Sequence, residues 1–317
     1  MLKGFWFEAA ASAPAPAVVL LHGCGGPYDK RGVLAQRMRD YAALLNRLGM
    51  HALVVDSLTP RGETQICTQK VRSRLITQAN RRLDAQSSLE WLAARPDVDA
   101  SRLGLMGWSN GGSTVLAATN EHHKEVADAD VKPAFAVAFY PGCEVEAKRG
   151  YATHTRVLLL VGELDDWTPP QACQRLAAQA ADPRPVIETY RGAYHGFDST
   201  VPVRLRTDVP NGLNPGKGVH VGRNPAALKQ SRERLLQFLA AAAASEPSRY
   251  REAWRLGMCS RTDASMKSKA CAGTVAPNCL RRWRDNTPPF WWHDKTSVDK
   301  VDPTRSYRRS TSFATLS

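Results

Sequence analysis

The 317-residue sequence has no uninterrupted apolar run of the roughly 18 to 20 residues that a membrane-spanning helix needs. Its first residues, MLKGFWFEAAASAPAP, contain one lysine and a short apolar patch that Glu8 interrupts, which is too weak for the hydrophobic region of a secretory signal. We therefore expect a soluble body with no membrane partner. As the sequence is written it should be cytoplasmic, and periplasmic or secreted if the true start lies upstream.

The common signatures of metal and nucleotide sites are also missing. None of the seven cysteines forms a CxxC pair, and no HxxxH accompanies them, so no zinc pattern is present. The glycine-rich run His22 to Gly26 is not followed by GK[ST], which excludes a P-loop for phosphate. We expect neither a metal ion nor an organic cofactor.

Cysteines occur on both sides of a change in composition near residue 245. Cys24, Cys67, Cys143 and Cys173 precede it. These four could form two disulfides in an oxidising compartment or remain buried thiols in a reducing one, and we favour thiols.

Apolar periodicity ends near residue 245, where a run of alanines gives way to Ser, Arg, Lys, Trp and Pro. We predict one α/β domain over residues 1–245 and a disordered or weakly ordered extension over residues 246–317, in which basic residues are twice as common as acidic ones. The run Arg281 to Arg284, followed by Phe290 to Trp292, could contact phosphates and stack bases, but we favour an extension without nucleic acid. A shifted reading frame is a third explanation, and the oligomeric state stays open.

Within residues 1–245, short apolar strands alternate with amphipathic helices. The predicted strands are Val18–His22, His51–Val55, Arg102–Met106, Ala134–Tyr140, Val157–Gly162 and Val186–Tyr190, and the main helices are Val33–Leu48, Ser73–Ala94 and Pro225–Ala242, the last capped by Asn224. This alternation is typical of an α/β fold with a mostly parallel central sheet and helices on both faces. Ligands of such sheets bind at the carboxyl ends of the strands.

One strand runs directly into the motif Gly107-Trp108-Ser109-Asn110-Gly111, which fits G-x-S-x-G and opens a helix. Glycines two positions either side of the serine relieve crowding in the sharp turn that exposes a nucleophilic hydroxyl. A strand, this turn and a helix in succession are much more specific than the motif alone. We therefore predict that Ser109 is a nucleophile.

A serine hydroxyl needs a base to take its proton, and the base needs an acid to orient it. His195 follows the last predicted strand and is our candidate base, the alternative being an ordinary loop histidine. Asp165 follows the strand Val157–Gly162 and is our candidate acid, although Glu163 and Asp166 lie beside it. The chain order Ser, Asp, His is that of the α/β-hydrolase fold.

The oxyanion of a tetrahedral intermediate requires backbone N–H donors. We predict that these are the amides of Asn110, next to Ser109, and of Cys24, within the glycine-rich turn after the first strand. At that position Cys24 would contribute its backbone rather than its thiol.

The sequence from about Pro16 to Leu239 resembles the dienelactone hydrolase family of α/β-hydrolases. The matching segments, in order, are HGCGG, DSLTPRG, GWSNGG, FYPGC, GELDDWTPP and YHGFD. In the family's aspartate motif the acid lies three residues after the glycine and four before the proline, which selects Asp165. Founding members carry cysteine at the nucleophile, where this sequence has Ser109, so the resemblance implies a general esterase more than an enzyme for dienelactone.

The resemblance also suggests pocket residues. Arg61 would form or brace the pocket, or simply belong to a turn, and Tyr28, Tyr140 and Trp167 would line it, or serve only in packing. Only about 16 residues separate the strands Ala134–Tyr140 and Val157–Gly162, so we expect no large cap domain there. The loop from Ser199 to Arg223 is the alternative cover.

Together these features predict a serine hydrolase that cleaves small carboxylic esters or lactones through an acyl-enzyme on Ser109. A serine peptidase of the same fold would use the same three residues, and parallel ester and peptide assays would separate the two. A non-catalytic binding protein is the third possibility.

Overall fold

The computed structural model describes residues 2–11, 14–244 and 299–300. Most of the predicted extension, residues 246–317, lies outside the described residues. The helices are α1 (Gln36–Arg47), α2 (Gln78–Ala93), α3 (Asn110–Thr119), α4 (Lys124–Ala127), α5 (Glu144–Arg149), α6 (Pro170–Gln179) and α7 (Pro225–Ala244), with short 3₁₀ turns at η1 (Thr59–Arg61) and η2 (Val71–Ser73).

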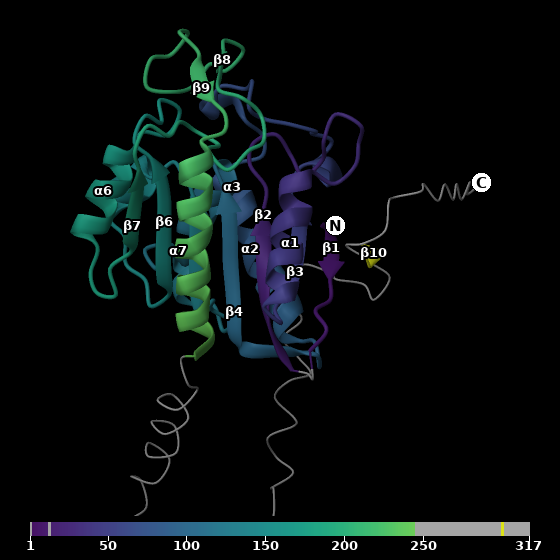
Figure 1. Ribbon diagram of the computed structural model, residues 1–317. Coiled ribbons are helices and arrows are strands. Elements are labelled where there is room, and N and C mark those ends of the chain that lie inside the picture. The colour runs from purple at the N-terminus through teal and green to yellow at the C-terminus, as the bar shows by residue number, and fades with distance from the viewer. Residues whose placement is uncertain (1, 12–13, 245–298, 301–317) are drawn as a thin grey trace, which may run out of the picture. The chain divides into compact units, whose positions relative to one another are not determined.

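One large twisted sheet organises the described residues (Figure 1). Its strand order is β10-β1-β3-β2-β4-β5-β6-β7, and only the β1–β3 pair is antiparallel. The strands are β1 (Lys3–Phe7), β2 (Ala15–Leu21), β3 (His51–Asp56), β4 (Val98–Trp108), β5 (Phe135–Phe139), β6 (Arg156–Gly162), β7 (Val186–Tyr190) and β10 (Asp299–Lys300). The predicted mostly parallel α/β sheet is confirmed.

Helices cover both faces of this sheet, and α1 and α7 lie in front of it in Figure 1. Strand β2 is buried along its whole length because both faces are covered. Its side chains alternate between two hydrophobic clusters, with Val18 and Leu20 in the cluster that includes α1 and α7, and Val19 and Leu21 in the one that includes α2, α3 and α6.

Several boundaries differ from the sequence-based expectation. Helix α2 begins at Gln78 rather than near Ser73, because Thr77 and Asn80 form a reciprocal capping box there. The segment Ser199 to Arg223 is not only a loop, since β8 (Arg204–Arg206) and β9 (Val219–Val221) pair as a small antiparallel sheet. The predicted cap of α7 is present, with Asn224 Oδ1 accepting a hydrogen bond from the Ala227 N–H at 3.1 Å.

The expectation of thiols is wrong, because the four body cysteines form two disulfides. Cys24 bonds to Cys67 and Cys143 to Cys173, with Cα–Cα distances of 4.9 and 5.0 Å. These distances suit a disulfide, although the partners are 43 and 30 residues apart in the sequence. Cys24 follows β2 and Cys143 follows β5, so both bonds anchor loops at the carboxyl ends of parallel strands.

Between β5 and β6 the chain adds only the six-residue helix α5, so no cap domain is inserted there. Within the described residues, no helix combines the length and the apolar character needed to cross a bilayer.

Candidate active site

Ser109 lies in the sharp turn that joins β4 to α3, and its φ of 55° is unusual for a residue other than glycine. The neighbouring glycines make this turn possible. A Cβ on Gly107 would lie 2.3 Å from the carbonyl oxygen of Gly111, and one on Gly111 would lie 2.0 Å from that of Leu21. The G-x-S-x-G pattern therefore reflects backbone contacts on both sides of the serine.

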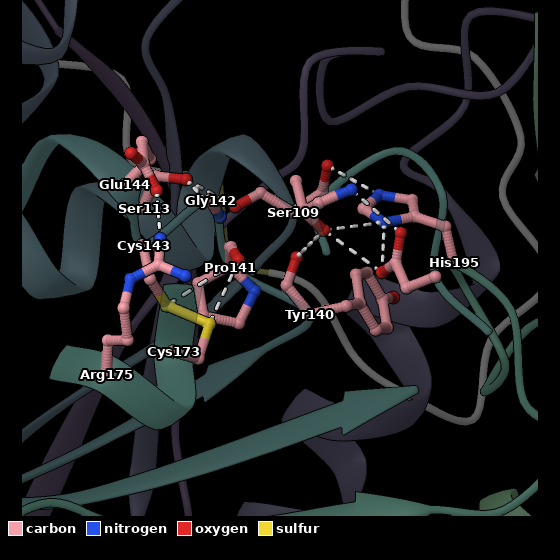
Figure 2. The surroundings of a disulfide bond; sticks show 12 residues. Ser109, Ser113, Tyr140, Pro141, Gly142, Cys143, Glu144, Cys173, Arg175 and His195 are labelled. Carbon is pink, nitrogen blue, oxygen red and sulfur yellow. Dashed lines mark hydrogen bonds and ion pairs between the residues drawn. A yellow bond between two sulfur atoms is a disulfide. The ribbon is translucent and has the colours of Figure 1, made fainter. Parts of the chain in front are cut away.

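His195 connects Ser109 to Asp165. The Oγ of Ser109 lies 2.8 Å from Nε2 of His195, and Nδ1 of the same ring lies 2.8 Å from Oδ2 of Asp165. His195 and Asp165 are 4% and 3% exposed, so water competes little for these hydrogen bonds. Figure 2 shows Ser109 and His195 side by side, with Tyr140 next to them.

Asp165 is held by its own loop. Its Oδ1 accepts hydrogen bonds from the backbone N–H groups of Trp167 and Thr168, at 2.9 and 2.8 Å. The other two acids of this loop face elsewhere: Glu163 accepts from the Gly192 N–H, and Asp166 accepts from the backbone and ring of His220. The structure thus brings Asp165, and neither neighbour, to His195.

Thr168 is a site residue that the sequence reasoning did not single out. Its Oγ lies 3.0 Å from Oδ2 of Asp165, 3.0 Å from the carbonyl oxygen of Tyr140 and 3.1 Å from Nδ1 of His195. It joins the loops after β5, β6 and β7. Its position three residues after Asp165, suited to a local side-chain to backbone turn, was the available signal.

The glycine-rich turn after β2 lies against the serine. A Cβ on Gly23 would be 3.5 Å from Cβ of Ser109, and Cys24 follows directly. Among the described residues, the N–H groups of Cys24 and Asn110 donate to no acceptor. These two amides therefore remain the candidate donors for an oxyanion formed at Ser109.

The four predicted pocket residues separate into two groups. The rings of Trp167 and Tyr140 each have their centroid 4.7 Å from that of His195. Arg61 instead pairs with Asp84 at 2.7 Å, and the ring of Tyr28 packs on Phe5 at 5.8 Å. Tyr140 is only 2% exposed, so it packs beneath His195, whereas the partly exposed Trp167 lies at the surface of the site.

Asp198 forms a buried network beneath the site that the sequence did not reveal. Its carboxylate accepts hydrogen bonds from Arg37, Tyr41, Trp108 and Tyr140. Burial, together with the Asp198 charge, raises the pKa of Tyr41 well above its ordinary value, so its phenol stays protonated. Trp108 precedes the nucleophile candidate and Tyr140 contacts His195, so Asp198 holds both sides of the Ser109–His195 pair.

Two basic residues are buried at the glycine-rich turn, His22 at its start and Arg81 on α2. Burial, followed by the positive charge of Arg81, holds the pKa of His22 well below its usual value. Its Nε2 accepts from the Ser57 N–H at 3.3 Å and its Nδ1 lies 2.7 Å from the Gly23 carbonyl, as expected for a neutral ring. Burial lowers the pKa of Arg81 to about 10, which leaves it charged at neutral pH.

This arrangement suits nucleophilic chemistry at a carbonyl. A histidine between a serine and a carboxylate can take the hydroxyl proton while the carboxylate fixes its tautomer. Within the described part of the chain, no three His, Cys, Asp or Glu side chains are grouped as metal ligands.

Comparison with known proteins identifies the family and the fold of this chain. Residues 2–243 match the family model described as the dienelactone hydrolase family. An uncharacterized protein of Mycobacterium tuberculosis is 24% identical over an alignment of 198 residues that covers 58% of this chain and 64% of that protein. The chain therefore spans slightly less than two thirds of that relative's length.

Two solved structures share the fold. Esterase 2 of Thermogutta terrifontis superposes with a TM-score of 0.54 at 18% identity, covering 77% of this chain and 91% of the esterase. A dienelactone hydrolase-like promiscuous phosphotriesterase from metagenomic libraries superposes with a TM-score of 0.52 at 18% identity, covering 75% and 92%. At these identities the likeness establishes the fold alone.

Proposed function

Because this chain belongs to the dienelactone hydrolase family, we propose that it is a serine hydrolase that cleaves carboxylic esters or lactones through an acyl-enzyme on Ser109. The family makes the chain a hydrolase of the dienelactone hydrolase type. The proposal for Ser109 itself rests on two hydrogen bonds of His195. Its Nε2 lies 2.8 Å from Ser109 Oγ, and its Nδ1 lies 2.8 Å from Asp165 Oδ2.

In the first half of the reaction, Ser109 Oγ attacks the carbonyl carbon while His195 Nε2 takes the hydroxyl proton. The carbonyl π pair becomes an oxyanion, which the N–H groups of Cys24 and Asn110 stabilise. As the intermediate collapses, His195 returns the proton to the departing alcohol and the acyl group stays on Ser109. Asp165 keeps the ring oriented and stabilises its protonated form.

In the second half, water replaces the alcohol. His195 takes a proton from the water as its oxygen attacks the acyl carbon, and the same amides stabilise the new oxyanion. Collapse releases the carboxylic acid and returns the proton to Ser109. For a lactone, alcohol and acid remain in one molecule, so a single hydroxy acid leaves.

The surroundings of Ser109 favour small esters. Trp167 and the buried Tyr140 contact His195, and the Arg206 guanidinium lies 5.5 Å from the Trp167 ring centroid. No cap domain is inserted between β5 and β6. The small β8–β9 sheet lies against the site, since Val221 forms a β-bridge with His195.

We also propose that the protein works in an oxidising compartment. One described disulfide joins two loops of the site region and the other joins the loop after β5 to α6, and such bonds persist where thiols are not kept reduced. The periplasmic or secreted alternative is thereby favoured over the cytoplasm.

A fluorophosphonate probe tests the nucleophile directly, because it phosphonylates only an activated serine. We expect one covalent adduct, located at Ser109 by peptide mass spectrometry, and a strongly reduced labelling rate in His195→Ala. An adduct at another residue, or equal labelling of both proteins, would contradict the proposal. Parallel assays with p-nitrophenyl butyrate and a peptide p-nitroanilide separate esterase from peptidase, and we expect turnover of the ester only.

A further inference from the structure

Arg81 on α2 is fully buried, yet its hydrogen-bond acceptors are neutral. Its Nη1 donates to Oδ1 of Asn110 at 2.5 Å, and its Nη2 donates to the carbonyl oxygen of His22 at 2.7 Å. Among the described residues, no carboxylate accepts a hydrogen bond from Arg81. Asp84, on the same helix, has both oxygens bound by Arg61.

This arrangement is energetically unfavourable by itself, since a buried charge is normally paired. The next residue shows the ordinary solution: Arg82 is also buried, at 7% exposure, and forms an ion pair with Glu125. Arg81 keeps its charge at neutral pH, although burial lowers its pKa to about 10. The charges of Asp84 and Asp56 act on Arg81 from nearby, but the hydrogen bonds of this buried guanidinium go to neutral groups of the site.

The two acceptors of Arg81 belong to the two segments that carry the proposed oxyanion donors. His22 begins the turn that leads to Cys24, and Asn110 follows Ser109 as the first residue of α3. The segments touch directly, because a Cβ on Gly111 would lie 2.5 Å from the carbonyl oxygen of His22. The planar guanidinium spans both segments with its two Nη groups, which a compact ammonium group could not do in the same way.

We propose that Arg81 is a positioning residue for the oxyanion site. It fixes the Cys24 turn and the start of α3 relative to each other, so that the two N–H groups converge on one oxygen. Its positive charge also acts across a buried, weakly screened region on the negative charge that develops on that oxygen. This inference rests on the proposed hydrolysis at Ser109.

Such a residue should act on the transition state and little on substrate binding, because the charge on oxygen exists only after attack. For p-nitrophenyl butyrate, we expect Arg81→Met to lower kcat by about 100-fold, with KM changed by less than about threefold. Arg81→Lys keeps the positive charge but lacks the planar guanidinium with its two Nη donors, and its kcat should fall by only about tenfold. An alkyl trifluoromethyl ketone, which forms an oxyanion adduct with the serine, should bind to each variant more weakly by the factor by which kcat/KM falls.

Arg82→Met is the matched control, since it removes a buried arginine from the same helix without touching His22 or Asn110. We expect it to lower thermal stability while kcat stays within about threefold of the wild type. If Arg81→Met does not fold, Asn110→Ala removes the same hydrogen bond from the other end. That variant should lose about tenfold in kcat, with a matching loss in ketone affinity.

The outcomes are distinguishable. If the wild type turns over the ester and binds the ketone, but Arg81→Met behaves like Arg82→Met, or ketone affinity does not follow kcat/KM, the role of Arg81 is refuted and the hydrolase remains. If the wild type neither hydrolyses the ester nor binds the ketone, the proposed function fails and the role of Arg81 fails with it.

Discussion

At the residue scale, Asp165 is distinguished from its neighbours by what it touches. It contacts His195, whereas the adjacent Asp166 pairs with the partly exposed His220. We expect Asp165→Asn to reduce kcat/KM for p-nitrophenyl butyrate by about 10⁴-fold, because the amide would favour the wrong tautomer of His195. Asp166→Asn is the matched control and should stay within about threefold. Similar losses in both variants would show that Asp165 has no special role.

His22 gives a prediction about pH and stability. Its pKa is lowered in the folded protein by burial and then by Arg81, so below the ordinary value of 6.5 the unfolded chain binds a proton that the folded chain does not. The free energy of unfolding should therefore fall as the pH drops through this range, by up to about 1.4 kcal/mol per pH unit. The variant His22→Gln can still donate and accept hydrogen bonds but does not titrate. Between pH 7 and pH 5, urea denaturation should therefore show a smaller decrease in its free energy of unfolding than in that of the wild type. Equal decreases in the wild type and in His22→Gln would show that His22 does not cause this pH dependence.

The sequence could identify Ser109, His195 and Asp165 as candidates because their motifs follow strands that end at one edge of a parallel sheet. It could not identify Arg81, Thr168 or Asp198 as their supports. Those roles depend on contacts between segments far apart in the chain, such as the 161 residues between Arg37 and Asp198. The type of a side chain alone does not show whether it makes such a contact or simply faces solvent.

At the element scale, the Asp198 network joins α1, the end of β4 and the residue after β5. Burial alone would lower the pKa of Arg37, but the facing carboxylate raises it. We expect Asp198→Asn to reduce the free energy of unfolding by about 2 to 3 kcal/mol, because it leaves the guanidinium without its anion. Glu233→Gln, which breaks an exposed pair with Lys229, should cost less than about 1 kcal/mol. If thermal denaturation shows the same loss of unfolding free energy in Asp198→Asn and Glu233→Gln, a structural role for the network is contradicted.

Element boundaries show what periodicity can and cannot predict. The buried strands of the sheet were predictable because a parallel strand covered on both faces is continuously apolar. The start of α2 was placed too early because apolar residues precede its true cap, and one of them, Leu75, is 86% exposed. The three-residue strands β8 and β9 are too short for any alternation to be detected.

At the scale of the whole molecule, two disulfides cross-link the site region. In the loop-entropy description, closing loops of 43 and 30 residues stabilises the fold by about 4 kcal/mol each. We expect a reducing agent to lower the melting temperature, and the double variant Cys143→Ser, Cys173→Ser to reproduce part of that change. Peptide mapping without reduction should recover Cys24 linked to Cys67. Free, alkylatable thiols at all four positions in protein from an oxidising compartment would contradict the disulfides and the proposed location.

The α/β architecture was predictable because short apolar strands and amphipathic helices alternate along the sequence, which agrees with one topology. The disulfide pairing was not, since it depends on how segments that follow different strands approach each other, as the loop after β5 and helix α6 do (Figure 2). The same loops carry the site, so the fold fixes both the chemistry and its cross-links at the carboxyl edge of the sheet.

The most direct test of the central claim is hydrolysis of short-chain p-nitrophenyl esters by the purified protein and by Ser109→Ala. We predict steady turnover by the wild type and a loss of at least 10³-fold in the variant, with an unchanged melting temperature. Undiminished turnover in Ser109→Ala, or no turnover by a correctly folded wild type, would contradict a serine hydrolase that works through Ser109.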